Sequence, residues 1–333
     1  GNPNNLEYSI VQQKGYKFLP VYVKGMPRKI GFKFIWWAFK LGIAVMQSLF
    51  YLHRYKPKAI FGTGGYVSAP IMIASILERK TPFMMHDCDA QPGLVTRKLA
   101  PYASAVSLAF DKAQDFIKNK NCHVNGNPLR PRFKTLNKGL ARAGLTLDYK
   151  RPVLLVMGGS QGAKSIDDAF VEIIKELSTV NNLQIIFQTG KKNYQSVMER
   201  LEKIYPKNHR DKNLIIRPYF DDMVTVLKAA DIVISRAGSL SLSEIFASDV
   251  APVLIPYPHA ASDHQRRNAK FVEEKGACVY LEDSETNPNT LLAIVNNLLE
   301  DEELQTRLRT NASELAQFDA LQHIVQQFVE VAK

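Results

Sequence analysis

The sequence predicts an α/β protein made of two doubly wound domains that face a cleft. Three observations lead to this fold class. Short apolar runs alternate with helical patterns along the whole chain, which is typical of parallel sheets covered by helices on both faces. Glycine-rich or polar turns follow these runs, at the strand ends where open α/β sheets bind ligands. The chain has 333 residues, 46% of them hydrophobic, which is enough for two cores.

Seven apolar runs are predicted to be strands. They occupy residues 59–61, 82–85, 153–157, 183–188, 214–217, 232–235 and 253–256. Apolar residues at helical spacing lie between them and predict helices over residues 165–177, 196–204 and 240–247. Repetition of strand, loop and helix in this way predicts parallel pairing of the strands.

The charge changes sign along the chain. Residues 1–150 hold 23 Lys and Arg against 7 Asp and Glu, whereas residues 151–333 hold 20 against 25. A polar, basic stretch precedes the strand at residue 153. We therefore expect domains over residues 1–148 and 149–315, and a C-terminal helix over residues 316–333 that returns to the first domain.

The basic half should attract a polyanion, either nucleic acid or an anionic membrane surface. Nucleic acid is disfavoured, because the sequence has no motif of a known binding module and no zinc-finger spacing. The three cysteines, Cys88, Cys122 and Cys278, are far apart and fit neither a disulfide framework nor a zinc site. We expect three buried thiols in a cytosolic protein.

The most hydrophobic segment, residues 32–52, predicts a helix that lies on a membrane surface. It is long enough to cross a bilayer, but Lys33 and Lys40 interrupt it, and a charge near the centre of a spanning helix costs about 2.5–3.5 kcal/mol. Its apolar residues at helical spacing are Phe32, Ile35, Trp36, Phe39 and Ile43. The alternative is an amphipathic helix that buries this face in the core.

A glycine-rich turn after the strand at residues 153–157 predicts a phosphate site. The turn consists of Gly158, Gly159, Ser160, Gln161, Gly162 and Ala163, and a helix follows it. Small residues let backbone N–H groups approach an anion, and the helix N-terminus adds a partial positive charge. Ser160 can add a hydroxyl donor, although many such turns merely reverse the chain.

The segment from Ser235 to Glu244 predicts a contact with a ribose. Its serines could simply cap the helix that follows. Glu244 lies one turn into that helix, where a carboxylate can accept hydrogen bonds from two ribose hydroxyls. A phosphate loop and a ribose carboxylate in one domain indicate a nucleotide ligand.

The polar loop over residues 256–269 carries two further candidates. Gln265 and Asn268 lie at i and i+3 on one helix face, and side-chain amides donate and accept, as recognition of sugar hydroxyls requires. His259 and His264 do not have the spacing of a recognised metal site.

The basic half carries a second glycine-rich turn, at residues 62–68, and a histidine after a strand. His86 could be a general base oriented by Asp87 or Asp89, or it could be a structural histidine. Arg130, at the end of this half, could reach a phosphate from the opposite side of the cleft.

Together these motifs resemble the peptidoglycan N-acetylglucosaminyltransferases of glycosyltransferase family 28, which have a two-domain GT-B fold and need no metal or other cofactor. The matching segments are GTGGYVSAP (62–70), HDCDAQPGLVTRK (86–98), GNPLR (126–130), GGSQGA (158–163), AGSLSLSEI (237–245) and PYPHAASDHQRRNA (256–269). The resemblance implies an inverting transfer of N-acetylglucosamine from UDP-N-acetylglucosamine to lipid I, which is undecaprenyl-pyrophosphoryl-N-acetylmuramyl-pentapeptide. It also implies a peripheral protein at the cytoplasmic face of the plasma (inner) membrane.

The resemblance implies roles for individual residues as well. The donor would contact Asp89, Arg130, Ser160, Gln161, Gly162, Phe220, Ser239, Leu240, Ser241, Leu242, Ser243, Glu244, Gln265 and Asn268. The acceptor would contact Gly64, Gly65 and Tyr66, and the membrane patch would comprise Phe32, Lys33, Ile35, Trp36, Phe39 and Lys40. The implied partners are the two substrates, the anionic membrane surface and proteins of cell-wall synthesis.

Two departures from the family pattern bear on the expected activity. Asp89 stands where the family has an amide, so the position loses a donor and gains repulsion toward a diphosphate. Gly1 matches a point well inside the family pattern, so we expect a truncated chain that lacks the first strand and the GGTGGH loop with the favoured catalytic histidine. His86 is then the substitute candidate. The alternatives are a related glycolipid glycosyltransferase, or a non-catalytic protein that binds the donor or serves as a scaffold.

Overall fold

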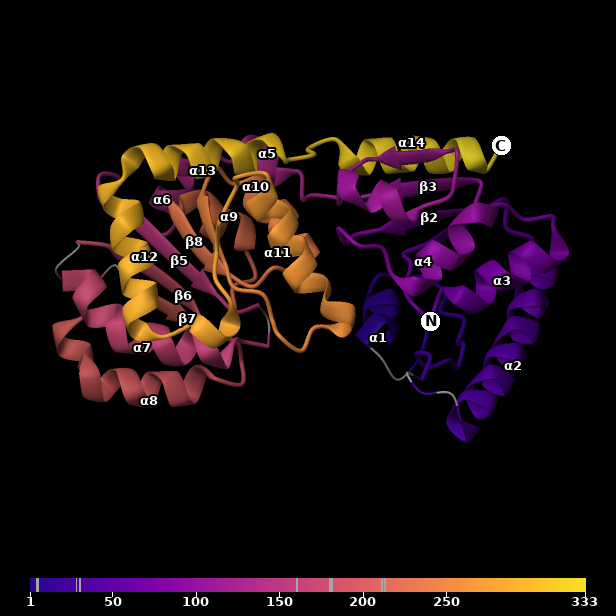
Figure 1. The fold of residues 1–333 in the computed structure, drawn as a ribbon, viewed down its shortest axis with the longest axis horizontal. Helices are drawn as coiled ribbons and strands as arrows, with labels where there is room; N and C mark the ends of the chain where they lie inside the picture. The colour runs from indigo at the N-terminus through magenta and orange to yellow at the C-terminus, as the bar shows by residue number, and fades with distance from the viewer. Residues whose placement is uncertain are drawn as a thin grey trace. The chain divides into compact units, whose positions relative to one another are not determined.

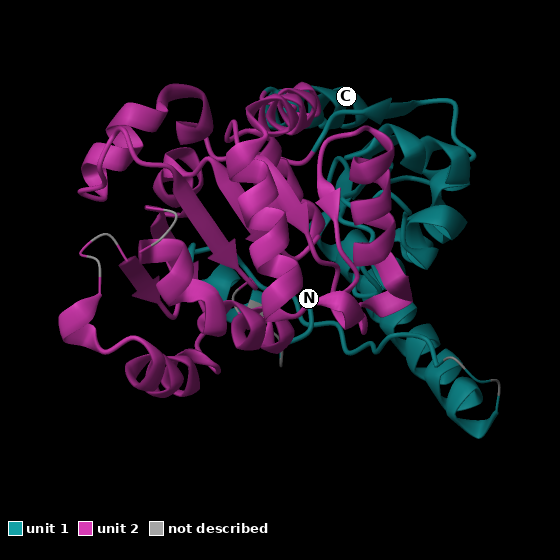
Figure 2. Ribbon diagram, turned by 60° about the vertical axis from the view of Figure 1, so that its left-hand side comes forward, with its two compact units in different colours: residues 1–126, 319–333 teal, residues 127–318 magenta. Residues whose placement is uncertain are grey.

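A computed structural model describes residues 1–3, 6–27, 29, 31–159, 161–179, 182–210, 212 and 214–333. The chain divides into two compact units, which Figure 2 shows in different colours. Unit 1 consists of Gly1–Gly126 together with Asp319–Lys333, and unit 2 consists of Asn127–Phe318. Each unit has its own parallel sheet, which confirms the prediction of a two-domain α/β fold.

Unit 1 is built on a four-stranded sheet with the spatial order β1-β2-β3-β4. The strands are β1 (Ile60–Gly62), β2 (Phe83–Asp87), β3 (Ala105–Leu108) and β4 (Cys122–Val124). The helices are α1 (Leu6–Gln13), α2 (Phe32–Tyr55), α3 (Ala69–Glu78), α4 (Leu94–Leu99) and α14 (Ala320–Val331), with short 3₁₀ turns at Ala100–Tyr102 and Asp111–Phe116. All residues of β2 and β3 are buried, as expected for central parallel strands.

Helix α14 belongs to unit 1 although it comes at the end of the chain. Figure 1 shows it alongside β2 and β3, and it contacts both strands. Ile324 of α14 packs with Met84 and Ala105. On the other side of the unit, α2 packs against α3 through Val45 and Leu52. The core of unit 1 is therefore closed by segments from both ends of the sequence.

Unit 2 is built on a six-stranded parallel sheet with the spatial order β10-β9-β8-β5-β6-β7. The strands are β5 (Val153–Met157), β6 (Gln184–Gln188), β7 (Leu214–Arg217), β8 (Ile232–Ser235), β9 (Ala251–Leu254) and β10 (Val279–Tyr280). The helices are α5 (Arg132–Thr135), α6 (Lys138–Gly144), α7 (Lys164–Thr179), α8 (Tyr194–Ile204), α9 (Met223–Ala229), α10 (Ser239–Phe246), α11 (His264–Glu274), α12 (Pro288–Glu300) and α13 (Glu302–Glu314). Short 3₁₀ turns occur at Lys207–His209, Ala261–Asp263 and Asp283–Glu285.

Strand β5 is the first strand of unit 2 in the sequence but lies in the middle of the sheet. It pairs with β6 on one side and with β8 on the other, through Leu154↔Ile185 and Leu154↔Ile232. All strands stay parallel, but successive strands are added toward one edge from β5 to β7 and toward the other edge from β8 to β10, so the strand order reverses between β5 and β8. In doubly wound sheets this switch point is where ligands bind, outside the carboxyl ends of the strands.

Helix α7 fixes the geometry next to that switch point. Its buried face includes Ile166, Phe170, Ile174 and Leu177, and the helix packs against α8 and α12. Full burial of each of these side chains stabilises the fold by about 1.5–3 kcal/mol. The amphipathic pattern that predicted this helix is therefore also what holds its N-terminus at the end of β5.

All seven predicted strands and all three predicted helices are present, with small shifts at some ends. Strands β3, β4 and β10 were not predicted from the sequence, and they have only four, three and two residues. Ser107 and His123 interrupt the apolar character of β3 and β4, so these strands form because neighbouring strands offer pairing partners, not because of a local pattern.

The division between the units differs from the predicted boundary at residue 148. Residues 127–148 belong to unit 2, where the buried Arg142 donates to the carboxylate of Asp231 and to Ala229 O (3.1 Å). Lys138 Nζ lies 3.0 Å from Asp231 Oδ1. The change in net charge misled the prediction because the basic residues of this segment pair with acidic residues of unit 2.

Replacing Asp231 by Asn should destabilise the protein strongly, because it leaves the Arg142 guanidinium buried beside a neutral amide. Breaking one partner of a buried pair costs about 3–5 kcal/mol. The carboxylate also accepts from the Val153 N–H (2.8 Å), at the start of β5. In urea unfolding, the control Glu273→Gln, which breaks an exposed pair with Lys270, should lose less than about 1 kcal/mol. Equal losses would mean that residues 127–148 do not depend on this ion pair.

Candidate functional site

The glycine-rich turn after β5 is held by close backbone packing. Gly162 has φ +80°, and a Cβ there would overlap Thr189 O and lie 2.7 Å from Asn193 Nδ2. Gly190, with φ +77°, is packed so closely that a Cβ would overlap Gly162 N. A hydrogen bond from Gly162 N to Gly159 O (3.1 Å) closes the turn. Only glycine fits at Gly162 and Gly190, so these positions fix the path of the turn.

The turn leads directly into α7, which begins at Lys164. Gln161 is exposed and Gly162 is half-buried, so this part of the backbone is open to solvent. Ser160, which was predicted to donate to a phosphate, lies outside the described residues. The exposed turn and the N-terminal end of a 16-residue helix together form the arrangement that binds phosphate groups.

Glu244, the predicted ribose carboxylate, lies in α10, which follows β8. Because β8 is the neighbour of β5, the loops after both strands lie at the same edge of the sheet. The side chain of Glu244 is one-fifth exposed, and burial raises the pKa of its carboxyl group while the nearby Arg130 guanidinium opposes the rise. A partly buried carboxylate at this edge can accept hydrogen bonds from hydroxyl groups of a ligand.

Arg130 lies in unit 2, which corrects the prediction that it acts from the first domain. Its Nη2 is 3.5 Å from Glu244 Oε1, and half of its side chain is exposed. Asn127, also in this segment, donates to Ser243 Oγ (3.0 Å) of α10. These contacts hold the segment on α10, so Arg130 shares its position with the predicted ribose carboxylate.

The serines at the start of α10 do not cap it. Gly238 is the N-cap residue, and no side chain caps the helix. Ser239 is buried, and its carbonyl oxygen accepts from Ser243 Oγ (3.1 Å). Leu242 is completely buried, so its side chain belongs to the core, whereas Leu240 is exposed and Ser241 half-buried. Of the predicted contacts in this helix, only the exposed or partly exposed side chains and the backbone at its start can meet a ligand.

The two predicted sugar-reading amides have different environments. Gln265 is half-buried, and its Oε1 accepts a hydrogen bond from the Tyr257 N–H (2.9 Å). Asn268 is completely buried and donates to Ala237 O (3.3 Å). Asn268 therefore joins α11 to the loop before α10 in this structure and does not face solvent.

Phe220, predicted at the nucleobase, follows β7 and is half-buried. Its backbone N–H donates to Gln188 Oε1 (3.0 Å), a buried side chain at the end of β6. The carbonyl of Gly190, in the next turn, accepts from Thr189 Oγ1 (3.1 Å). The loops after β6 and β7 are thus fixed to each other at the same edge of the sheet.

Sequence reasoning missed Arg236, which is nine-tenths buried at the end of β8. Its guanidinium donates to Asp283 Oδ1 (2.6 Å), Ser165 Oγ (3.0 Å) and Ile255 O (3.1 Å). It therefore ties the ends of β8 and β9 to the first turn of α7. A signal was present in the sequence, because a charged residue that directly continues an apolar strand needs buried partners.

In unit 1, the predicted acceptor turn after β1 packs on the loop after β2. Gly64 has φ +71°, and a Cβ there would overlap Thr96 Oγ1 and lie 2.9 Å from Asp87 Oδ2. Gly65 and Tyr66 are exposed, and Gly65 O accepts from Ser68 Oγ (2.7 Å). The turn is therefore rigid at Gly64 and open to solvent at the next two residues.

Asp87 does not orient His86, which corrects one prediction. The Asp87 carboxylate accepts from Thr96 Oγ1 (2.5 Å), the Gly93 N–H (3.1 Å) and the Asp89 N–H (3.2 Å). Neighbouring side chains of a strand point to opposite faces of the sheet, so Asp87 and His86 face apart. Burial raises the pKa of Asp87, and its hydrogen bonds oppose the rise.

His86 is a buried residue of β2, and its Nδ1 lies 3.0 Å from Ser107 Oγ. Ser107 accepts from Asn125 Nδ2 (3.0 Å), which also donates to Gln327 Oε1 (2.9 Å) of α14. This buried network joins three neighbouring segments of unit 1 to its C-terminal helix. It favours the structural alternative for His86.

Within the described residues, Asp87, Cys88 and Asp89 form the one group whose ligand atoms are close enough together to hold a metal ion. Both carboxylate oxygens of Asp87 already accept hydrogen bonds from the protein. The hydrogen bonds of Asp87 hold the loop after β2 together, which accounts for the clustering without an ion. Of the cysteines, Cys278 is buried, whereas Cys88 and Cys122 are only partly so.

The predicted membrane residues lie on the exposed face of α2. Phe32, Ile35, Trp36 and Phe39 have exposed fractions of 83%, 68%, 53% and 58%, and Ile43, Met46 and Phe50 extend the same face. Ala44, Val45, Ser48 and Leu52 form the buried face. The alternative that the aromatic face packs in the core is therefore wrong. By length and composition, α2 is also the one helix among the described residues that could cross a membrane.

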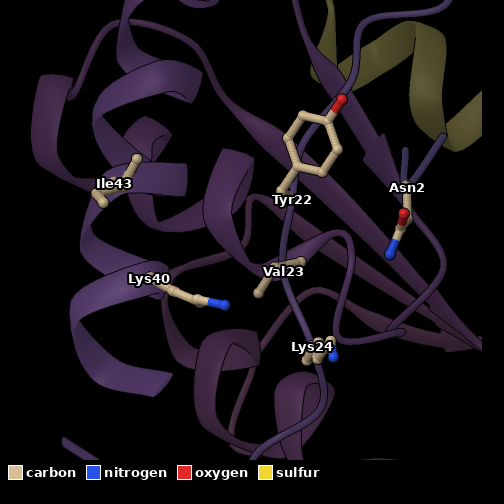
Figure 3. Close-up of a pocket in the computed structure, with 6 residues that line it drawn as sticks. All are labelled: Asn2, Tyr22, Val23, Lys24, Lys40 and Ile43. Atoms are coloured by element: carbon tan, nitrogen blue, oxygen red, sulfur yellow. The ribbon is translucent and has the colours of Figure 1, made fainter. Parts of the chain in front are cut away.

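Two cavities adjoin this face of α2. A pocket of about 300 Å³ is lined by Asn2, Tyr22, Val23, Lys24, Lys40 and Ile43, and Figure 3 shows Lys40 pointing from the helix toward Val23. A shallower apolar groove of about 700 Å³ is lined by Ala38, Phe39, Leu41, Gly42, Ile43, Val45, Met46 and Ile73. Lys40 Nζ also lies 5.3 Å from the Trp36 ring, which stacks on Phe39. Aromatic, apolar and basic groups are thus interleaved on one surface.

Comparison with known proteins identifies one family for both parts of the chain. Residues 1–108 match the glycosyltransferase family 28 N-terminal domain, and residues 153–326 match the glycosyltransferase family 28 C-terminal domain. The chain is similar to the UDP-N-acetylglucosamine–N-acetylmuramyl-(pentapeptide) pyrophosphoryl-undecaprenol N-acetylglucosamine transferases of two bacteria. The Halothermothrix orenii protein is 36% identical over 306 residues, which cover 90% of this chain and 82% of that protein. The Desulforamulus reducens protein is 32% identical over 329 residues, 98% of this chain and 87% of that protein.

A solved structure agrees with these matches. The crystal structure of Acinetobacter baumannii MurG superimposes with a TM-score of 0.75 at 26% sequence identity. The superposition covers 99% of this chain and 89% of that one.

The packing of the glycine-rich turn predicts unequal effects of two similar substitutions. Gly159 and Gly162 both have positive φ, so Ala at either position should cost about 1–2 kcal/mol in backbone strain. Gly159 has no atom within 4 Å of a built Cβ, whereas Gly162 has two close neighbours. Urea unfolding should therefore show an additional loss of about 1–3 kcal/mol for Gly162→Ala, from overpacking. If Gly159→Ala is as destabilising, the turn is not held by the contact at Gly162.

Proposed function

The chain belongs to glycosyltransferase family 28, and on that premise we propose that it transfers N-acetylglucosamine from UDP-N-acetylglucosamine to lipid I, giving lipid II for peptidoglycan synthesis. It is a hexosyltransferase with the two-domain GT-B fold. The printed names of its relatives specify this donor and this acceptor, so they favour the reaction over that of other glycolipid transferases.

The observation that supports the proposal best lies within unit 2. The first pair of features, the glycine-rich turn and the N-terminus of α7, follows β5. The second pair is Glu244, in the helix α10 that follows the neighbouring strand β8, and Arg130, which lies 3.5 Å from Glu244 and comes from the segment before α5. The first pair of features suits a diphosphate and the second suits the hydroxyl groups of a ribose. Both lie next to the switch point of the strand order, which is where doubly wound sheets bind ligands.

The reaction is a displacement with inversion at the anomeric carbon. The oxygen of the acceptor hydroxyl attacks that carbon and gives up its proton to a base, the bond to the diphosphate oxygen breaks, and UDP leaves with the electron pair. The charge that develops on UDP would be stabilised by the N–H groups of the turn and the positive end of α7. We propose that these groups make a metal ion or other cofactor unnecessary.

The other predicted residues have supporting places in this scheme. Gln265, with its amide nitrogen uncommitted to Tyr257, would read the sugar, while Asn268 would keep the α10 loop in place. Gly65 and Tyr66 of unit 1 are exposed and would meet the acceptor. Deprotonation of the acceptor is not assigned to His86, because that ring is buried and bonded to Ser107.

We propose further that α2 binds the cytoplasmic surface of the plasma membrane, where a polyprenyl-linked acceptor is anchored. The exposed aromatic face would enter the interface, and the neighbouring basic residues would contact anionic headgroups. The sequence has no acidic residue between Glu7 and Glu78, so nothing in this segment opposes that attraction.

Removing the Glu244 carboxylate should weaken binding of the donor. Glu244→Ala is expected to reduce affinity for UDP-N-acetylglucosamine by about 1–3 kcal/mol, because two hydroxyl groups lose their acceptor. Calorimetry in the presence of EDTA measures this and tests metal independence in the same titration. The control Glu303→Ala removes an exposed carboxylate of α13 and should leave affinity unchanged. Unchanged affinity in Glu244→Ala would remove Glu244 from the ribose site.

Membrane binding should have a salt-sensitive part and a salt-resistant part. Attraction of basic residues to anionic lipid contributes about 1 kcal/mol for each residue near the surface, and salt screens it. Burial of Trp36 and Phe39 in the interface adds an apolar contribution that salt does not remove. The double variant Trp36→Ala, Phe39→Ala should therefore bind vesicles more weakly at high salt, with unchanged thermal stability because both side chains are exposed.

Sedimentation with vesicles that contain anionic lipid measures both parts. A matched control replaces Leu140 and Tyr149, two exposed residues of unit 2, by Ala and should sediment like the unaltered protein. If the double variant binds vesicles normally but unfolds at a lower temperature, Trp36 and Phe39 stabilise the fold and do not face lipid.

A further inference from the structure

An acidic side chain lies buried behind the glycine-rich turn of unit 2, and the reaction described above does not use it. Asp167, in the first turn of α7, is 1% exposed. Its carboxylate accepts from Asn193 Nδ2 (2.6 Å). Among the described residues, nothing forms a hydrogen bond with its other oxygen, Oδ1. A buried carboxylate with an unpaired oxygen is costly when charged and much less so when neutral.

Asp167 is connected to the turn itself through Asn193. The amide that donates to Asp167 is also the group that lies 2.7 Å from the position a Cβ would take on Gly162. The backbone N–H of Ala163, the last residue before α7, favours the charged form of the same carboxyl group. Any change in the charge of Asp167 therefore acts on groups that touch the turn.

The charged groups around Asp167 come from three elements. Asp168 and Lys164 are on α7, and Lys164 Nζ pairs with Asp168 Oδ2 (2.5 Å). Arg236, after β8, faces the carboxyl group, but its guanidinium is already paired with Asp283 Oδ1 (2.6 Å) of the loop after β10. Burial raises the pKa of Asp167 to about 7, and the Asn193 amide and Arg236 oppose the rise. The acid therefore changes charge near neutral pH.

Resting on the donor site proposed above, we propose that Asp167 is a positioning residue that must be neutral for the turn and α7 to bind the diphosphate of the donor. An ionised carboxylate in the first turn of a helix neutralises the positive end of the helix dipole. That same positive end is what a diphosphate would use, so the two anions compete for it. When Asp167 is neutral, the positive end of the helix dipole is available to the diphosphate. When Asp167 is ionised, its negative charge repels the diphosphate.

This role predicts a pH dependence with a defined sign. The affinity for UDP-N-acetylglucosamine should fall about tenfold between pH 6 and pH 8.5, as expected for one added charge a few ångströms from the diphosphate. The diphosphate diester of this donor does not change charge over that range, so the protein must supply the titrating group. Asp167→Asn keeps the shape of the side chain without the acid, so its affinity should be independent of pH and exceed that of the unaltered protein at pH 8.5.

Calorimetry of the full chain at several pH values provides the test, with Asp168→Asn as the matched control. Asp168 is the next residue, but its side chain is partly exposed and pairs with Lys164 and Arg200. Its charge adds to the raised pKa of Asp167, so its variant should keep a pH dependence of the same size with a midpoint at lower pH. A second measurement needs no variant. At pH 7.5 the unaltered protein should take up protons when the donor binds. The measured heat of binding should then depend on the ionisation enthalpy of the buffer.

The outcomes separate the two proposals. Donor binding without pH dependence and without proton uptake, or a pH dependence that persists in Asp167→Asn, overturns the role of Asp167 and leaves the proposed function intact. Absence of donor binding at every pH overturns both. A pH dependence that disappears only in Asp167→Asn, together with proton uptake, supports the role.

Discussion

The contact between the backbones of Gly162 and Gly190 is the constraint on which the site in unit 2 depends. Both residues have positive φ and neither has room for a Cβ. The contact brings the turn after β5 against the turn after β6, and it determines where α7 begins. Since α7 is anchored along its length by fully buried apolar residues, the position of its N-terminus is determined from both ends. A helix dipole is useful to an anion only if it is held still in this way.

Buried polar side chains behind this turn join the loops that surround the site. Arg236 joins the ends of β8 and β9 to α7, and Asn268 joins α11 to the loop before α10. Neither side chain is exposed, so each acts on a ligand through the loops it holds. Glu244 and Arg130 remain partly exposed beside them. The site therefore consists of a few exposed groups supported by a larger buried set.

Much of the fold followed from the sequence, because its strands and helices have strong local patterns. The strands from β5 to β9 each contain a run of at least three apolar residues, and α7 repeats apolar residues at helical spacing. The boundary between the units could not be predicted from charge, because Lys138 and Arg142 pair with an acid that is distant in sequence. The exposed side of α2 was undecided for a similar reason: an aromatic helical face looks the same whether it meets a core or a membrane.

The functional residues also fall into those that the sequence predicts and those whose contacts depend on the folded structure. The glycine-rich turn and Glu244 were recognisable because their chemistry is local, whereas the contacts of Asn268 and the partner of His86 depend on packing. Asp167 could have been noticed, since it lies three and seven residues before Phe170 and Ile174 on the apolar face of α7.

The central claim is that the donor binds at the glycine-rich turn and at α10 of unit 2 without a metal ion. Amide hydrogen exchange with and without UDP-N-acetylglucosamine, with EDTA present, is the most direct test of it. We expect slower exchange in residues 158–166 and 236–245 when the donor is bound. Slower exchange confined to other segments, or no change at a saturating concentration of the donor, would contradict the claim.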